Sequence, residues 1–107
     1  MKKSNTPTIF IFEDDPYISA TISWKISSLG KLLVATTYLE GQELLNNMSG
    51  SAVAIVDLHL GNDHYAGKKL LIHCTQKNIP TIMISSDEDE ELIAELYRLG
   101  ATHFLLK

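Results

Sequence analysis

Two apolar runs in this chain each end on acidic residues. Residues 52–56 lead into Asp57, and Thr8–Phe12 leads into the acidic triplet 13–15. Neither run alternates polar with apolar residues, a pattern that is typical of strands buried on both faces. Open α/β sheets bind their ligands at the carboxyl ends of the strands, and this is where the acids would stand.

If the two strands are parallel neighbours, four carboxylates meet in one crevice. At about 5 Å and an effective dielectric constant near 20, each pair of carboxylates repels by roughly 3 kcal/mol. A fold that gathers this much like charge needs a cation, a raised pKa, or both. We therefore take Asp57 as the centre of a predicted site.

The composition narrows the class of protein. A chain of 107 residues is long enough for one domain with its own core. The net charge of −4 argues against a general nucleic-acid binder, which needs a basic face. Cys74 is the single cysteine and fits a reducing compartment, where it would pack as a small core residue. No apolar run reaches the roughly 20 residues of a membrane span. The apolar run that follows residues 1–5 is also too short for a signal peptide. We therefore expect a cytoplasmic domain without membrane contacts.

Strand-like and helix-like segments alternate along the chain, which predicts a parallel sheet covered by helices. The fold class is therefore α/β, a doubly wound sheet of five strands. The predicted strands are residues 8–12, 32–37, 52–57, 81–85 and 102–106. The predicted helices are residues 16–29, 39–48, 68–77 and 90–99, with a loop over 58–67.

Local signals support three of these helices. Asp15 before Pro16 is typical of an N-cap followed by proline at the first helical position. Gly30 and Gly100 would close the first and fourth helices in the left-handed conformation. The predicted apolar faces are Ile18, Ile22, Ile26 and Leu29 in the first helix, Leu70, Leu71 and Cys74 in the third, and Leu92, Ile93, Leu96 and Leu99 in the fourth.

Four short segments, each at the end of a predicted strand, together resemble the receiver domain of two-component response regulators, the CheY-like family. They are Ile-Phe-Glu-Asp-Asp at 11–15, Ile-Val-Asp-Leu-His-Leu at 55–60, Ile-Pro-Thr-Ile-Met-Ile-Ser-Ser at 79–86 and Gly-Ala-Thr-His-Phe-Leu-Leu-Lys at 100–107. The resemblance covers residues 1–107 as one receiver domain. It implies a flavodoxin-like sheet with the strand order 2-1-3-4-5.

The resemblance also implies a phosphorylation site that contains Mg²⁺. Asp57 would accept a phosphoryl group from a histidine kinase or a histidine phosphotransfer protein. Asp14, Asp57 and the main-chain carbonyl of His59 would bind the ion directly, with Glu13 acting through water. Mg²⁺ prefers hard oxygen ligands of this kind and keeps several waters.

Three further residues match family positions around the phosphate. Ser85 would contact a phosphoryl oxygen and take part in the switch, Lys107 would supply a point charge to the phosphate, and Phe104 falls at the switch aromatic. Phosphorylation would then change an output surface that acts on an output domain of the parent chain. The domain would not be an enzyme beyond catalysing its own phosphorylation and dephosphorylation.

The sequence departs from the family pattern in two places. The loop after Asp57 lacks the proline that is frequent in the family, and it is about two residues longer than the family's loop. His59 and Asp87 stand at positions that, in the family, tune the lifetime of the phosphate. The last helix of the family has no counterpart in these 107 residues, so we expect a shortened domain. Its fifth strand would then be an exposed edge that favours a homodimer.

Other interpretations were weighed against this one. A flavodoxin-like cofactor binder is disfavoured because the loop after the first strand is acidic. A Mg²⁺-dependent phosphohydrolase is disfavoured because His59 stands where such enzymes place a second acid. A phosphorylation-independent pseudo-receiver, acting as a protein-interaction module, remains the alternative. The four histidines fit no zinc spacing and are interpreted as surface residues. Lys107 as a solvated residue and Phe104 as simple packing also stay open.

Overall fold

The computed structural model describes residues 6–107. Residues 1–5 lie outside the described part, and so does the prediction that they do not begin a signal peptide. Within residues 6–107, nine elements alternate strictly between strand and helix. The strands are β1 Thr8–Phe12, β2 Lys31–Ala35, β3 Ala52–Asp57, β4 Thr81–Ser85 and β5 His103–Leu106. The helices are α1 Pro16–Ile26, α2 Tyr38–Asn46, α3 Ala66–Gln76 and α4 Glu90–Arg98.

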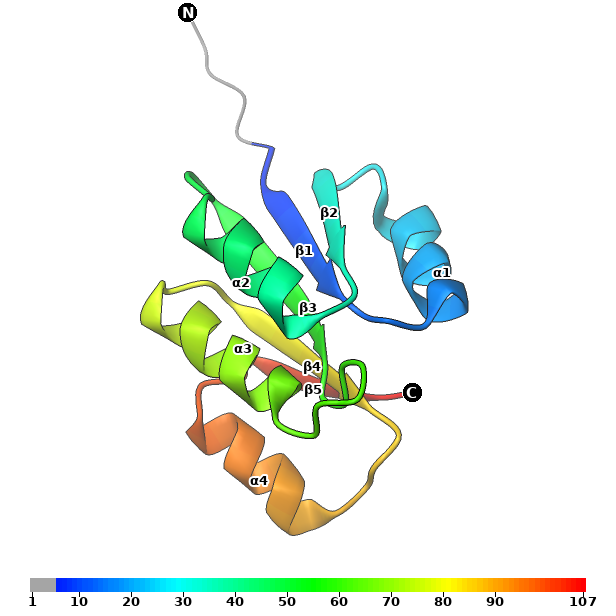
Figure 1. The fold of residues 1–107 in the computed structure, drawn as a ribbon, viewed down its shortest axis with the longest axis vertical. Helices are drawn as coiled ribbons and strands as arrows, with labels where there is room; N and C mark the ends of the chain where they lie inside the picture. The colour runs from blue at the N-terminus through cyan, green and yellow to red at the C-terminus, as the bar shows by residue number, and fades with distance from the viewer. Residues whose placement is uncertain (1–5) are drawn as a thin grey trace, which may run out of the picture.

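All five strands are parallel and stand in the order β2-β1-β3-β4-β5. This confirms the predicted α/β fold and its 2-1-3-4-5 order. Helix α1 covers one face of the sheet, and α2 and α3 lie side by side on the other (Figure 1). Strands β1 and β3 are central neighbours, so the acids that follow them must meet at one edge of the sheet.

The core explains why the central strands read as continuous apolar runs. Phe10 and Phe12 of β1 stack with their ring centroids 5.6 Å apart and are fully buried. They pack in one cluster with Val56, Leu70, Leu71 and Met83. Cys74 is buried in the same cluster, as predicted, and its burial raises the pKa of the thiol to about 11.

Several element boundaries differ by one to three residues from the predicted ones. Strand β2 spans 31–35 rather than 32–37, and α2 spans 38–46 rather than 39–48. Helix α3 begins at Ala66, so the preceding loop ends two residues earlier than predicted. Helix ends are the least determined part of such a pattern, because the last turn lacks partners for its own backbone groups.

The first helix was predicted less well than the others. Ile18, Ile22 and Ile26 are half-buried, which agrees with the predicted apolar face, although no residue of α1 is fully buried. Leu29 does not belong to this face, because it lies beyond the end of α1 and is 61% exposed. The predicted left-handed cap at Gly30 is wrong, since Gly30 is not among the residues with positive φ. A side chain at residue 30 would instead meet the Pro7 carbonyl oxygen at 2.3 Å. Gly100 does adopt a positive φ of 116°, as predicted.

Strand β5 forms one edge of the sheet, and its Leu105 and Leu106 are 55% and 50% exposed. They line an apolar groove with Ile18 and Ile22 of α1. Exposed apolar edges favour association, so homodimer formation stays a prediction. Within residues 6–107, no helix has the length and apolar character needed to cross a membrane.

Candidate functional site

The end of the central strand β3 positions Asp57. Its side chain is nearly buried, with a residue exposure of 3%. The main-chain N–H of Leu58 donates to the Ile84 carbonyl at 2.9 Å, which extends the contact with β4 past the acid. The main-chain N–H of His59 donates to Asp57 Oδ1 at 3.2 Å. The carboxylate is therefore fixed by the backbone that follows it.

The acidic triplet after β1 divides into residues with different tasks. Asp15 caps α1 by accepting the N–H of Tyr17 at 2.9 Å. Glu13 is 1% exposed and turns inward, where its Oε2 accepts the Asp15 N–H at 3.0 Å. Asp14 is exposed. The prediction that Asp15 is a helix cap is confirmed.

Glu13, Asp14 and Asp57 form the acid cluster. One carboxylate oxygen from each lies within 4.8 Å of the others. Glu13 Oε1 is buried and has no hydrogen-bond partner, although buried polar atoms are usually paired. Three hard oxygen donors this close together fit a small divalent cation, which takes carboxylate and water ligands. This donor set contains no imidazole.

Lys107 brings a positive charge to the acid cluster. Its Nζ lies 3.1 Å from Asp57 Oδ2 and 3.2 Å from Glu13 Oε1. Glu13 Oε1 thus has an ion-pair partner in Lys107, although it accepts no hydrogen bond. The Lys107 main-chain N–H donates to the Ser85 carbonyl at 2.8 Å and so extends β5 along β4.

The surroundings shift the ionisation of Glu13 and Lys107. Burial raises the pKa of the Glu13 carboxyl, and the nearby Asp57 charge raises it further, although the Asp15 N–H and Lys107 oppose the shift. Burial alone would lower the pKa of Lys107, but its contacts with Asp57 and Glu13 outweigh burial and raise it. Lys107 therefore stays charged beside the two buried carboxyl groups.

Ser85 and Phe104 lie on the strands next to the cluster. Ser85 is 1% exposed at the end of β4, and its Oγ accepts the main-chain N–H of Asp87 at 3.0 Å. Phe104 is half-buried and packs against the hydrophobic core, while its main-chain N–H donates to the Tyr97 hydroxyl at 3.0 Å. Of the predicted site residues, Glu13, Asp14, Asp57 and Lys107 are thus in direct proximity, and Ser85 is joined to them through the Lys107 backbone.

The histidines are distributed over the surface, as predicted. His59, His64 and His103 are exposed, and His73 is half-buried. The rings of His59 and His64 face each other edge-on with centroids 6.2 Å apart. Burial lowers the pKa of His73, with a further contribution from Lys77.

Gly67 supports the site, and sequence reasoning did not single it out. A Cβ at residue 67 would lie 2.4 Å from the Leu58 carbonyl oxygen and 2.6 Å from that of Asp57. Helix α3 can therefore approach the end of β3 only with glycine at this position. The signal in the sequence was a glycine near the start of a helix, where it is otherwise unfavourable.

Comparison with known proteins gives one clear result and two negative ones. No protein-family model matches the sequence, and no curated protein matches it. Solved structures do match. The signal receiver domain of a protein described as a LuxO repressor from Vibrio parahaemolyticus superposes with a TM-score of 0.83 at 18% identity, over 95% of this chain and 78% of that one.

Two other solved structures are similar to this chain over nearly its whole length. The phosphorylated cyanobacterial phytochrome response regulator RcpA has a TM-score of 0.82 at 21% identity, over 95% of this chain and 81% of that one. The Mn²⁺-bound form of response regulator Rcp1 has a TM-score of 0.80 at 18% identity, over 94% and 81%. This chain therefore has the fold of the response regulator receiver domains, the CheY-like fold.

Proposed function

We propose that this domain is the phosphoacceptor of a two-component system and that Asp57 receives the phosphoryl group. The observation that carries the proposal is the acid cluster. Asp57 stands at the end of the central strand with Glu13 and Asp14 beside it and Lys107 Nζ 3.1 Å away. The similarity to phosphorylated RcpA adds support at the level of the fold.

The proposed reaction is a phosphoryl transfer onto a carboxylate. An oxygen of Asp57 forms a bond to phosphorus, the phosphorus–nitrogen bond of the donor's phosphohistidine breaks, and the bonding electron pair leaves with the imidazole nitrogen. Catalysis of such a transfer is mostly positioning and charge stabilisation. The His59 N–H orients the acceptor, and Lys107 compensates the charge of the incoming phosphoryl oxygens.

The acid cluster supports a divalent cation, and we propose Mg²⁺. Asp14 and Asp57 would bind it directly, together with the His59 carbonyl, and Glu13 would act through water. The ion would neutralise phosphoryl oxygens in the crevice. The Mn²⁺-bound form of Rcp1 supports a divalent ion at the level of the fold. When an ion is present, Glu13 Oε1, which accepts no hydrogen bond within the protein, would accept one from a water on the ion.

The switch would begin at Ser85. Its hydroxyl now accepts the Asp87 N–H, and turning toward a phosphoryl oxygen would release that turn at the start of the loop to α4. Phe104 would then repack beneath it. The partners we propose are a histidine kinase or histidine phosphotransfer protein and an output domain. The domain itself would have no substrate to turn over and would act in the cytoplasm.

Intact-protein mass spectrometry after treatment with acetyl phosphate and Mg²⁺ tests the proposal. We expect a single labile phosphoryl adduct on the wild type. The adduct should be absent from Asp57→Asn and absent without Mg²⁺. Glu88→Gln is a suitable control, since Glu88 is exposed and lies outside the acid cluster. An adduct that persists in Asp57→Asn would place the chemistry elsewhere.

A folded wild type that never acquires the adduct would overturn the phosphoacceptor function. The alternative would then be a phosphorylation-independent pseudo-receiver that binds a protein partner. In that case circular dichroism should still show a cooperative melt, because the fold depends on the core and not on phosphate. Repeated release of phosphate from the reagent, well beyond one equivalent at a high rate, would instead favour a phosphohydrolase.

A further inference from the structure

The loop between β3 and α3, residues 58–65, carries the backbone next to the acceptor and is held at both ends. On the arm next to β3, Leu58 and Leu60 are each 1% exposed and anchor the loop in the core. The chain then turns at Gly61, where φ is +64°, and returns so that Leu60 and Asp63 form an isolated antiparallel bridge. The position of the returning arm therefore decides whether this turn stays closed.

Asp63 fixes the returning arm with both of its carboxylate oxygens. Oδ1 accepts the main-chain N–H of Tyr65 at 2.8 Å, and Oδ2 lies 3.0 Å from Lys69 Nζ. The Asp63 carbonyl also accepts the N–H of Ala66, the first residue of α3. The Tyr65 N–H, and then Lys69, hold the pKa of Asp63 below its usual value.

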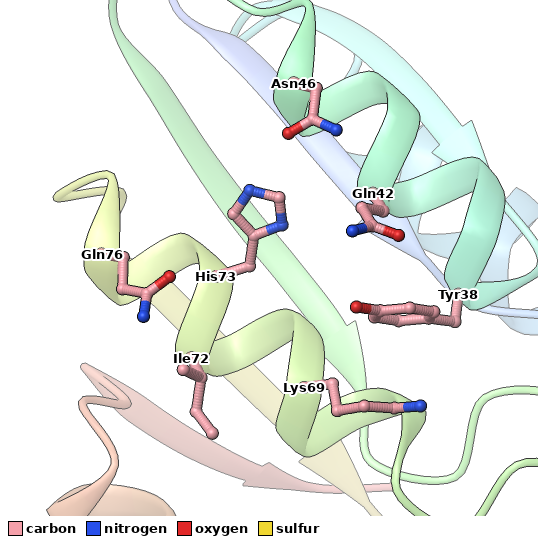
Figure 2. Close-up of a pocket in the computed structure, with 7 residues that line it drawn as sticks. All are labelled: Tyr38, Gln42, Asn46, Lys69, Ile72, His73 and Gln76. Atoms are coloured by element: carbon pink, nitrogen blue, oxygen red, sulfur yellow. The ribbon is translucent and has the colours of Figure 1, made fainter.

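Lys69 extends this anchor to a second helix. It lies one turn into α3, and its Nζ stands 4.4 Å from the centre of the Tyr38 ring, at the start of α2. Lys69 and Tyr38 lie at the same end of the groove between the two helices (Figure 2). A cation over an aromatic face at this distance is attractive. The loop, α3 and α2 are thus joined through one ammonium group.

We propose that Asp63 and Lys69 are positioning residues for the cation site: their ion pair holds residues 58–63 in the conformation in which the His59 backbone stands beside Asp57. The inference rests on the proposed function, because Asp63 and Lys69 would act on the cation only through the His59 carbonyl, which is a ligand in that proposal. Residues 58–65 contain no proline to restrict the backbone, and the Asp63–Lys69 pair supplies a constraint from outside the loop.

The expected effect follows from the population of the closed loop. A ligand that needs one conformation binds more weakly in proportion to the fraction of molecules in that conformation. Exposed ion pairs contribute little each, and this pair is partly exposed on both sides. We therefore expect Lys69→Met to weaken Mg²⁺ binding by up to about fivefold, the most that such an exposed pair gives in double-mutant cycles.

Calorimetric titration of the full chain with MgCl₂ tests this, with Lys68→Met as the matched control. Lys68 is the preceding residue of α3 and makes an ion pair of 2.9 Å, but with Glu95 of α4. Lys69→Met and Asp63→Asn should weaken binding, Lys69→Arg should restore it, and Lys68→Met should leave it unchanged. The double variant Asp63→Asn with Lys69→Met should be no weaker than either single variant, since both remove the same pair.

Hydrogen exchange on the metal-free protein gives a readout that does not depend on the ion. The amides of His59 and Leu60 should exchange faster in Lys69→Met than in the wild type and Lys68→Met. Equal exchange and equal affinity in the two lysine variants would overturn the inference. A wild type that binds no Mg²⁺ would overturn the proposed function, while the exchange data would still decide whether the pair positions the loop.

Discussion

The Tyr97 hydroxyl accepts the main-chain N–H of Phe104 at 3.0 Å. Tyr97 stands in the last turns of α4, and Phe104 is the second residue of β5, the outer strand of the sheet. Outer strands expose backbone groups that have no neighbouring strand. Here the side chain of a helix supplies the missing acceptor, so α4 and β5 are linked at the residue predicted to act as the switch aromatic.

Replacing Tyr97 with phenylalanine should lower the free energy of unfolding by about 1 kcal/mol, the usual net value of one hydrogen bond. The ring can stay in place, and only the acceptor for the Phe104 N–H is lost. Urea denaturation measures the change, with Tyr17→Phe as the control because Tyr17 is 85% exposed. Equal losses in the two variants would show that the Tyr97 hydroxyl contributes nothing specific.

Lys107 should stabilise the fold by compensating two buried carboxylates. Removing one partner of a buried ion pair leaves the other charge unpaired. The Lys107 side chain is 23% exposed, so solvent screens part of the effect, and we expect Lys107→Met to cost about 1–3 kcal/mol at neutral pH. Chemical denaturation should also show that MgCl₂ restores part of the loss. Full stability of the variant without Mg²⁺ would contradict this account.

The raised pKa of Glu13 makes stability depend on pH in a defined direction. Above the ordinary value of 4.5, the unfolded chain loses the Glu13 proton while the folded protein retains it, so the folded state binds more protons. Stability should therefore fall as pH rises from 4.5 through the raised pKa. Glu13→Gln cannot titrate and should flatten this part of the curve. Denaturation of both proteins across that range, without divalent ions, checks the sign.

Gly67 offers a test of the packing behind Asp57. Gly67→Ala would place a methyl group 2.4 Å from the Leu58 carbonyl oxygen, so α3 or the end of β3 must move, at a cost of about 1–3 kcal/mol. Gly50→Ala is the control. Residue 50 has a φ of +85°, so alanine strains the backbone there, but nothing stands within 4 Å of its Cβ and it lies away from the site. We expect only Gly67→Ala to weaken Mg²⁺ binding, as measured by calorimetry.

The sequence predicted the sheet and most of the acid cluster because both follow from simple patterns. Unbroken apolar runs indicate buried parallel strands, and an acid directly after such a run must stand at the edge of the sheet. The place of Leu29 on the face of α1 and the cap at Gly30 were predicted wrongly, since neither depends on helical spacing alone. Residue 30 is glycine because the Pro7 carbonyl comes within 2.3 Å of where a Cβ would stand, a contact between segments far apart in the chain.

The contacts that join different elements around the site could not be predicted either, because they depend on the folded path of the chain and not on local spacing. The Tyr97–Phe104 hydrogen bond and the contact of Lys69 with Tyr38 join different elements, and no periodicity in the sequence marks them. Asp63 and Lys69 are six residues apart across the start of α3, which is not a helical neighbour spacing. Only the path of the loop brings them together.

The neighbouring acids Asp14 and Asp15 allow the cation site to be separated from the stability of the helix. Asp14 is exposed and belongs to the acid cluster, whereas the Asp15 side chain caps α1. Asp14→Ala should therefore weaken Mg²⁺ binding at least tenfold, the order of effect seen when the surroundings of a metal site are altered, with little change in stability.

Asp15→Ala should have the opposite profile. Losing the cap should lower the free energy of unfolding by about 1 kcal/mol, while the three carboxylates of the cluster remain in place. Asp15→Asn should regain the stability, because asparagine also accepts the hydrogen bond of an N-cap. Calorimetry and urea denaturation of the three variants give both quantities. Equal weakening of Mg²⁺ binding by Asp14→Ala and Asp15→Ala would mean that the charge of the triplet matters and that Asp14 is not a specific ligand.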